Sequence, residues 1–173
     1  WGDKSWGQCN VPSGNDFIAI AAGFGYGLAL KSDGSIVGWG DNMYGQCNVP
    51  SGNDFIAIAA GYDYSYTLRS DGSIVEWIYG TTYALPGNGF IAIAAGFGYG
   101  LALKFDGSII DLWGYPIPLG NDFTAIAAGS YHGLALRADG SIVGWGGDAD
   151  GQATPPAGND FTALAVGEAH SLA

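Results

Sequence analysis

Basic residues are scarce in this chain, which has only 5 Lys and Arg against 16 Asp and Glu and a formal net charge of −11. Direct binding to the phosphate backbone of a nucleic acid needs clustered Lys and Arg, so no nucleic-acid partner is expected. Charged residues make up 12% of the sequence, about half the usual share. The acidic balance instead suits a soluble, self-repelling particle or one that meets a partner with a basic surface.

Long hydrophobic runs and close cysteine pairs are also lacking. No stretch reaches the length of about 18 apolar residues that a membrane span needs, so no membrane partner is expected. The 2 cysteines, Cys9 and Cys47, lie in two copies of the segment GQCNVPSG. Equivalent positions one repeat apart are expected to lie further apart than the about 7 Å between Cα atoms that a disulfide allows. The two thiols are therefore predicted to remain unbridged.

Motifs of catalysis and of cofactor binding are missing as well. The sequence has no GxSxG, HExxH, Walker-type loop or CxxC pair. His132 and His170 occupy equivalent repeat positions without a nearby Cys or second His, and a metal site needs convergent ligands. The segment GDADG at 147–151 lacks the further carboxylates of a calcium loop. We expect no enzyme activity, no cofactor and no metal.

What the chain has in abundance is repetition. Segments that begin at an Asn recur at spacings of 38, 35, 33 and 38 residues, and they start at Asn15, Asn53, Asn88, Asn121 and Asn159. A fixed period in this range is typical of solenoids, propellers and other arrays. We therefore expect a single repeat domain over 1–173. It would consist of the end of a blade at 1–14, full repeats at 15–52, 53–87, 88–120 and 121–158, and the start of a blade at 159–173.

The content of the repeat predicts short strands. Each full unit opens with FIAIAAG or FTAIAAG, in which both alternating positions are apolar, as in a strand buried on both faces. Two further apolar runs flank an Asp-Gly pair, which is a strong hairpin signal. A fourth, outer strand is expected from the QCNVP segment, whose Pro suits an edge. Three to four antiparallel strands with a period near 38 residues predict an all-β fold, a β-propeller.

At the end of the repeat the residues carry a family resemblance. The pattern AIAAG-x-x-[H/Y]-x-L-A-L-[K/R]-x-D-G-S-[I/V]-[V/I]-x-x-W-G-x-N-x-x-G-Q resembles the repeats of the regulator of chromosome condensation family. It is most similar to the short bacterial version, which includes the β-lactamase inhibitory protein II. The resemblance covers essentially the whole chain and implies a seven-bladed ring. Two repeats depart from the pattern, with IYGTTYALPG after Trp77 and GYPIPLG after Trp113.

Both ends of the chain match the interior of a repeat. Trp1-Gly2-Asp3 corresponds to Trp39-Gly40-Asp41, and the final GEAHSLA corresponds to residues 23–29. We expect either a piece of a longer propeller or an assembly in which open blade ends pair between chains, because an open blade exposes a large apolar face.

Candidate binding residues lie where the repeat varies. The connection from each repeat's Trp to the next Asn changes in length and content, and binding residues tend to lie on variable loops of a rigid scaffold. This connection contains aromatic residues, which are favoured interface anchors: Trp6, Tyr44, Tyr79, Tyr83 and Tyr115. The alternative is that these rings pack over the outer strand of their own blade, and the equivalent positions of Trp6 and Tyr44 favour that structural role.

The turn after the AAG run is the second variable segment. Its residues Tyr62, Asp63 and Tyr131 are candidates to face a partner. The recurring Tyr or His three residues after the Gly is expected to be structural, with its polar tip bonded to a backbone carbonyl between blades. The Trp at the end of each repeat, at 39, 77, 113 and 145, is expected to pack in the core.

The leading functional hypothesis is a non-enzymatic protein-binding scaffold, and the resemblance to the inhibitory protein implies an inhibitor-like role. One alternative is a guanine nucleotide exchange factor for a small GTPase, which chromatin-associated members of the family provide. Another is a self-assembling structural repeat protein. Export from a bacterial cell is implied by the resemblance alone.

Overall fold

A computed structural model describes residues 2–173, so Trp1 and its match to Trp39 lie outside the described residues. The chain divides into two compact units, Trp1–Gly89 and Phe90–Ala173. Within the described range every regular element is a strand, and the sheets are antiparallel. The all-β prediction is therefore confirmed.

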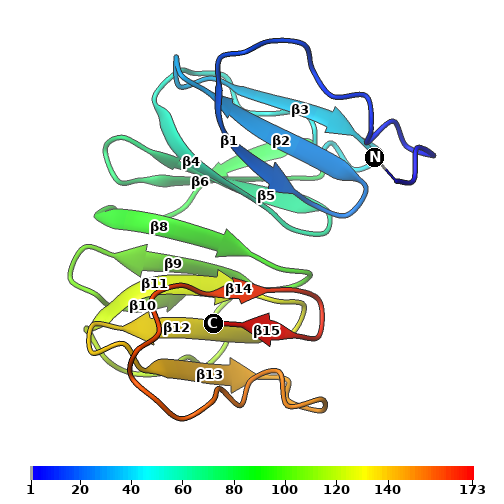
Figure 1. Cartoon of the computed structure of the whole chain (residues 1–173). Coiled ribbons are helices and arrows are strands. Elements are labelled where there is room, and N and C mark those ends of the chain that lie inside the picture. The colour runs from blue at the N-terminus through cyan, green and yellow to red at the C-terminus, as the bar shows by residue number, and fades with distance from the viewer. Residues whose placement is uncertain (1) are drawn as a thin grey trace. The chain divides into compact units, whose positions relative to one another are not determined.

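The first unit contains two sheets, shown in blue to green in Figure 1. One sheet has the order β1-β2-β3 and the other the order β4-β5-β6-β7. The strands of the first sheet are β1 (Phe17–Ala22), β2 (Tyr26–Lys31) and β3 (Ile36–Gly40). Those of the second are β4 (Phe55–Ala60), β5 (Tyr64–Arg69), β6 (Ile74–Ile78) and β7 (Thr81–Ala84).

The second unit contains three sheets, each of which again follows the chain order. The first is built from β8 (Phe90–Ala95), β9 (Gly100–Lys104) and β10 (Ile109–Asp111). The next is built from β11 (Phe123–Ala128), β12 (His132–Arg137) and β13 (Ile142–Gly146). The last pairs β14 (Ala165–Val166) with β15 (Ser171–Leu172).

The predicted Asp-Gly hairpins are present in all four full repeats. Gly34 has φ +81° and the other three hairpin glycines have similar values, which only glycine adopts readily. The carboxylate of Asp33 accepts hydrogen bonds from the Ser35 backbone N–H at 2.9 Å and from its hydroxyl at 2.6 Å. These bonds from Ser35 lower the pKa of Asp33. Asp-Gly-Ser is therefore a local structural motif that closes the turn.

The opening strand of each repeat is not buried on both faces as predicted. A register shift lies between Phe55 and Ala57, so that Ile56 is the extra residue of a β-bulge. Ile56 is consequently exposed, as are Ile18, Ile91 and Thr124 in the other bulges. A bulge interrupts the strict alternation of strand faces, which the apolar composition of FIAIAAG does not reveal.

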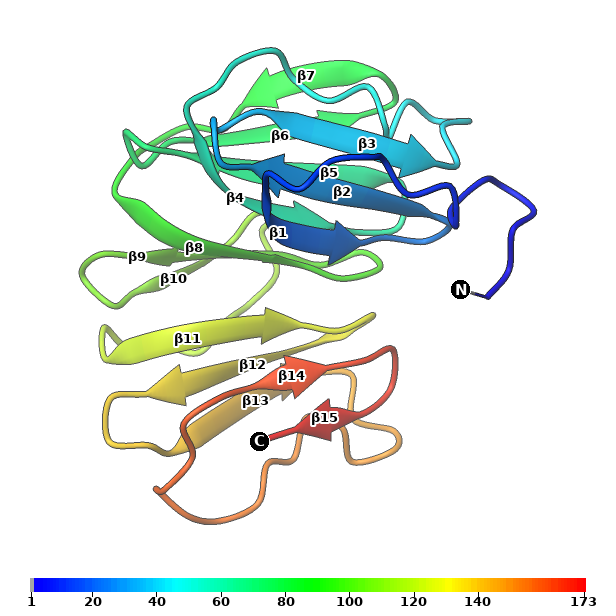
Figure 2. The same cartoon turned by 45° about the horizontal axis from the view of Figure 1, so that its top comes forward.

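The predicted outer strand also differs from the structure. The QCNVP segment at 46–50 forms turns and irregular backbone rather than a strand. Among the described residues a fourth strand occurs in one sheet, where β7 pairs with β6 (Figure 2). Tyr79 and Gly80 form the two-residue connection with φ +51° and +70°, values typical of a type I′ hairpin turn. The fourth strand thus comes from IYGTTYA, which departs from the repeat pattern.

The core of each unit lies between its sheets. In the first unit, Tyr26, Leu28 and Leu30 of β2 contact Phe55 and Trp77 of the neighbouring sheet. In the second, a cluster around Leu101 and Leu103 includes Phe123 and Ala135. Trp77 is fully buried, whereas Trp113 is 46% exposed, so the prediction that every repeat Trp packs in the core is wrong at Trp113. There β10 ends early, at Asp111.

The recurring Tyr or His links one sheet to the next, as predicted. The Tyr26 hydroxyl donates to the Tyr64 carbonyl oxygen at 2.8 Å and lies 2.7 Å from the Ser65 hydroxyl. In the second unit the buried His132 Nε2 lies 3.0 Å from the Ser171 hydroxyl. Since that hydroxyl donates to the Gln152 carbonyl at 2.8 Å, His132 Nε2 is the donor. His132 Nδ1 is then a buried acceptor with no hydrogen-bond partner among the described residues.

This histidine predicts a pH-dependent stability. Desolvation lowers the pKa of His132 below its ordinary value of 6.5, and the smaller attraction of Asp148 opposes it. Below the unfolded pKa the unfolded chain therefore binds a proton that the folded chain does not, and stability falls as pH drops from about 7 to 5. His132→Tyr introduces the residue type found at the equivalent position, Tyr26. We expect this variant to make the thermal unfolding temperature depend less steeply on pH. The matched control His170→Tyr removes the exposed histidine, and an equal flattening there would contradict the assignment.

Candidate functional site

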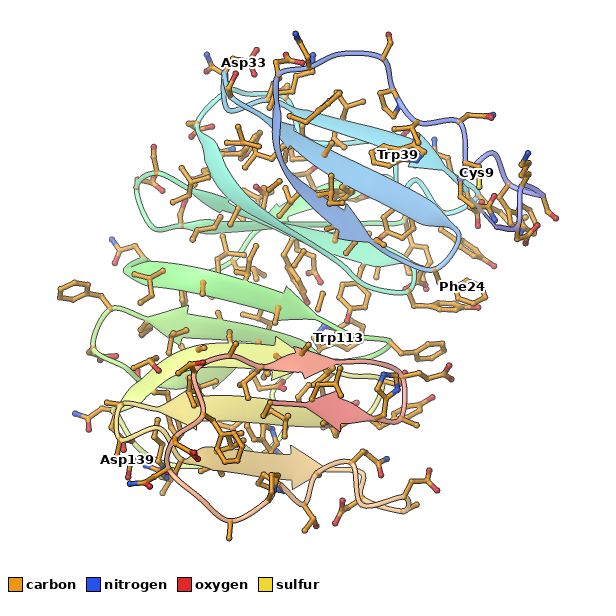
Figure 3. All side chains as sticks on the ribbon, in the orientation of Figure 1. Cys9, Phe24, Asp33, Trp39, Trp113 and Asp139 are labelled. Carbon is orange, nitrogen blue, oxygen red and sulfur yellow. The ribbon has the colours of Figure 1, made fainter. Side chains whose placement is uncertain are left out.

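The topology brings the variable segments to one end of each sheet. Because β2 runs antiparallel to both β1 and β3, the β1–β2 turn and the segment after β3 leave the sheet at the same end. The Asp-Gly hairpins lie at the opposite end. Figure 3 shows Phe24 and Asp33 at opposite ends of β2.

A glutamine-closed turn holds the aromatic residue of the segment after β3. The Gln46 side-chain oxygen accepts the Tyr44 backbone N–H at 2.9 Å, and Gly45 adopts φ +77°. A Cβ on Gly45 would lie 2.5 Å from the Gly80 nitrogen, so the turn requires glycine. The same turn recurs with Trp6 above Gln8 and with Asp150 above Gln152. Three different exposed side chains therefore occupy one constant backbone position.

The core anchors this turn from below. Gln46 is 1% exposed, and its backbone carbonyl accepts the Trp77 indole N–H at 2.9 Å. Trp39 makes the equivalent bond to the Gln8 carbonyl at 3.0 Å. Trp39 and Trp77 thus each fix the turn that lies 31 residues earlier in the chain, while the residue before the Gly of that turn is exposed.

Five of the predicted partner-binding residues come together in the first unit. Trp6, Tyr44, Tyr62 and Asp63 line one cavity with Phe24. The Phe24 and Tyr62 rings lie 4.6 Å apart between centroids. The fifth, Tyr79, packs edge-on against Tyr44 at 5.8 Å. We call the five rings the aromatic cluster: Trp6, Phe24, Tyr44, Tyr62 and Tyr79.

Two carboxylates belong to the same site. Asp63 accepts a hydrogen bond from the Tyr79 hydroxyl, and this bond and the negative charge raise the pKa of Tyr79. Asp41 also lines the cavity, and its side chain accepts the Met43 backbone N–H at 2.9 Å. The site therefore combines aromatic faces with fixed negative charge.

The other predicted residues lie elsewhere. Tyr83 lies on β7 opposite Glu76 and is exposed. In the second unit, Tyr115 stacks on Tyr99 at 5.9 Å between ring centroids, and Tyr131 lies 5.8 Å from Phe97. Tyr115 is held by its backbone N–H, which donates to Asp111 at 2.9 Å. Both of these aromatic pairs belong to the second unit.

Sequence reasoning missed Phe24 and Asp41. Phe24 occupies the position of Tyr62 in the turn after AAG, and this alignment is a signal that could have identified it. Asp41 follows the repeat's Trp-Gly pair and has no such signal. Its role depends on the return of the chain toward the β1–β2 turn, where the Asp41 N–H donates to the Gly25 carbonyl at 2.8 Å.

Residues 2–173 contain neither a cluster of metal-binding side chains nor a helix that could span a membrane. No group of three or more His, Cys, Asp and Glu lies in metal-binding proximity within that range. The same residues include no helix with the length and hydropathy to span a membrane. Cys9 and Cys47 are free thiols, as predicted. Burial raises the pKa of Cys47 to about 11.

Comparison with solved structures defines the class of protein. Yeast RCC1 (Prp20) bound to Kap60 matches with a TM-score of 0.74 and 20% identity, over 90% of this chain and 53% of that one. The ectodomain of the Physcomitrella patens receptor kinase CR4 matches with a TM-score of 0.74 and 23% identity, over 97% of this chain and 50% of that one. The sheets are thus blades of a β-propeller, and the chain spans about half the length of these relatives.

Comparison with family models names the repeat. Residues 17–46 and 123–152 match the model of the regulator of chromosome condensation (RCC1) repeat. Two segments of the chain therefore match this repeat, as the sequence pattern predicts. A search of curated proteins gives no match.

Proposed function

We propose that this chain is a non-enzymatic protein-binding scaffold whose contact surface in the first unit is the aromatic cluster. The observation that carries the proposal is the convergence of Trp6, Tyr44, Tyr62 and Asp63 on one cavity, with Tyr79 packed against Tyr44. They come from three successive repeats, and their common location follows from the fold.

The physical properties of the cluster suit an interface. Large aromatic side chains bury much area with few rotatable bonds. Trp6, Phe24, Tyr44 and Tyr79 are exposed, yet the backbones of Trp6 and Tyr44 are fixed by glutamine-closed turns. A surface that is ordered before binding loses less conformational entropy on association.

The comparisons support a protein partner without naming it. Prp20 has been crystallised with Kap60, and its binding to Gsp1p and histones has been described. An inhibitor-like role is the finer form of our proposal and rests on the resemblance of the repeats. An exchange-factor role has no specific support in the site described above.

Self-association is a second candidate with one observation in its favour. Ile20 of β1 is 80% exposed, whereas Ile58, Ile93 and Ile126 at the equivalent positions are partly buried. In a self-associated form, a blade of a second chain would cover Ile20. Mass measurement in solution tests this version, because a strictly monomeric chain would exclude it.

Site-specific crosslinking tests the protein-binding proposal. A photoreactive phenylalanine analogue at Tyr44 is expected to trap a defined protein from an extract of the source cells. The matched control places it at Phe105, which is 85% exposed and lies in a hairpin turn. Trapping should weaken when Trp6→Ala is added to the Tyr44 probe. Equal products from positions 44 and 105, or none from either, would count against the proposal.

A further inference from the structure

The cavity of the aromatic cluster has the size of a single side chain. Its volume is about 170 Å³, below the about 300–1,000 Å³ of pockets for drug-sized ligands. Four aromatic residues, Trp6, Phe24, Tyr44 and Tyr62, and two acidic residues, Asp41 and Asp63, line it. The lining therefore suits one protruding group that is both flat and positively charged.

The charge of this cavity is not neutralised by the chain itself. Its lining contains no Lys, Arg or His. The ion pairs found among residues 2–173 involve other carboxylates, those of Asp16, Asp54 and Asp122. Asp41 and Asp63 accept hydrogen bonds from neutral donors, the Met43 N–H and the Tyr79 hydroxyl. Rings and carboxylates both attract a cation, and a cation over an aromatic face gains more where water is excluded.

The chain already uses its own basic residues in such contacts. Each full repeat places a Lys or Arg over its opening Phe, with distances to the ring centroid of 5.7, 5.2, 5.6 and 4.8 Å for Lys31, Arg69, Lys104 and Arg137. These are four of the 5 Lys and Arg of the chain, and the fifth, Lys4, is not among the cavity residues. None of the Lys and Arg side chains in residues 2–173 therefore occupies the cavity.

We propose that the cavity of the aromatic cluster binds an arginine side chain presented by a protein partner. Guanidinium is planar, stacks on aromatic rings and pairs with carboxylates through several donors, whereas ammonium is a compact and strongly hydrated charge. The net charge of −11 steers such a basic segment toward the protein. This inference rests on the proposed function and names the chemistry of its partner.

A peptide titration tests the inference directly. The probe is acetyl-Gly-Gly-Arg-Gly-Gly-amide, followed through the tryptophan indole signals in NMR spectra of the full chain. The matched ligand replaces arginine with citrulline, which keeps the shape and removes the charge. We expect saturable binding of the arginine peptide and at least about tenfold weaker binding of the citrulline peptide. Equal affinity for the two peptides, or no saturable shift with arginine, would overturn the inference.

A lysine peptide and tetramethylammonium complete the ligand series. Arginine is expected to bind more tightly than lysine because only guanidinium stacks and pairs at once. Tighter binding of lysine or of tetramethylammonium would overturn the assignment to arginine and indicate a site for ammonium groups.

Isosteric variants locate the interaction. Asp63→Asn and Asp41→Asn remove charge but retain an oxygen for the Tyr79 hydroxyl and the Met43 N–H. Each variant is expected to lower the affinity for the arginine peptide several-fold and to leave the thermal unfolding temperature unchanged. Asp150→Asn removes the same charge from the equivalent turn, outside the cavity lining, and is expected to bind as the unmodified chain does.

The variants also separate this inference from the proposed function. If Trp6→Ala abolishes crosslinking of a partner at Tyr44 while Asp41→Asn and Asp63→Asn leave it intact, the protein-binding surface stands and the arginine assignment fails. If Asp41→Asn and Asp63→Asn bind the arginine peptide as tightly as Asp150→Asn does, the negative charge of the cavity has no part in recognition. The arginine inference is then wrong.

Discussion

Trp77→Ala is expected to lower the free energy of unfolding by about 3–5 kcal/mol. Trp77 is fully buried in the core of the first unit, so its removal leaves a cavity that neighbouring side chains fill only in part. Its indole N–H also bonds to the Gln46 carbonyl at 2.9 Å, and this buried acceptor would lose its partner. Denaturant unfolding followed by circular dichroism measures the change.

Trp113→Ala is the matched control, because Trp113 occupies the same repeat position but is 46% exposed. Trp113→Ala should lower the free energy of unfolding clearly less than Trp77→Ala does. Equal destabilisation by the two variants would show that exposure does not separate them. Trp77→Ala should also broaden the NMR signals of Tyr44, since the turn that holds Tyr44 is anchored on this indole.

Gly34→Ala is expected to destabilise the chain by about 2–5 kcal/mol, from about 1–2 kcal/mol of left-handed backbone strain and about 1–3 kcal/mol of overpacking. Gly34 has φ +81°, and a Cβ there would lie 2.2 Å from the Asn53 carbonyl oxygen. That oxygen belongs to the start of the next repeat, so the strain would reach the junction between two blades. Thermal and denaturant unfolding provide the measurement.

Gly151→Ala separates the two contributions. Gly151 has φ +79°, but a Cβ there would meet nothing within 4 Å. Gly151→Ala should therefore lower the free energy of unfolding by the backbone strain alone, about 1–2 kcal/mol. If Gly34→Ala and Gly151→Ala destabilise the chain equally, the close approach of the Asn53 backbone does not contribute.

The sequence was sufficient to predict the blade because its signals are local. The Asp-Gly pair determines the hairpin through positive φ at Gly34, and the periodic Asn positions identify the unit. The interface role of Tyr26 also follows from local chemistry, since a ring with a polar tip needs a partner when buried. Tyr26 finds one in the Tyr64 carbonyl, in the following blade.

The failures arise where distant contacts or an irregular strand decide the outcome. The bulge at Ile56 depends on the pairing register of β4 with β5, in which Phe55 lies opposite Arg69. The composition of a strand does not determine its pairing register. The fourth strand depends on a type I′ turn at Tyr79-Gly80, in a segment that the repeat pattern does not cover. The gathering of Trp6, Phe24 and Tyr62 requires knowing that three loops leave their sheets at one end.

The glutamine-closed turn separates what must be kept from what can be exchanged. Its closure uses the backbone, a glycine and a buried glutamine, as in the pair Gly45 and Gln46, and none of these groups depends on the side chain displayed above them. Three different residues, Trp6, Tyr44 and Asp150, occupy the position before the Gly of this turn. Surface substitutions away from structural contacts usually change stability by less than about 0.5 kcal/mol. Under the proposed function, single substitutions at this position can therefore change the binding specificity at little cost in stability.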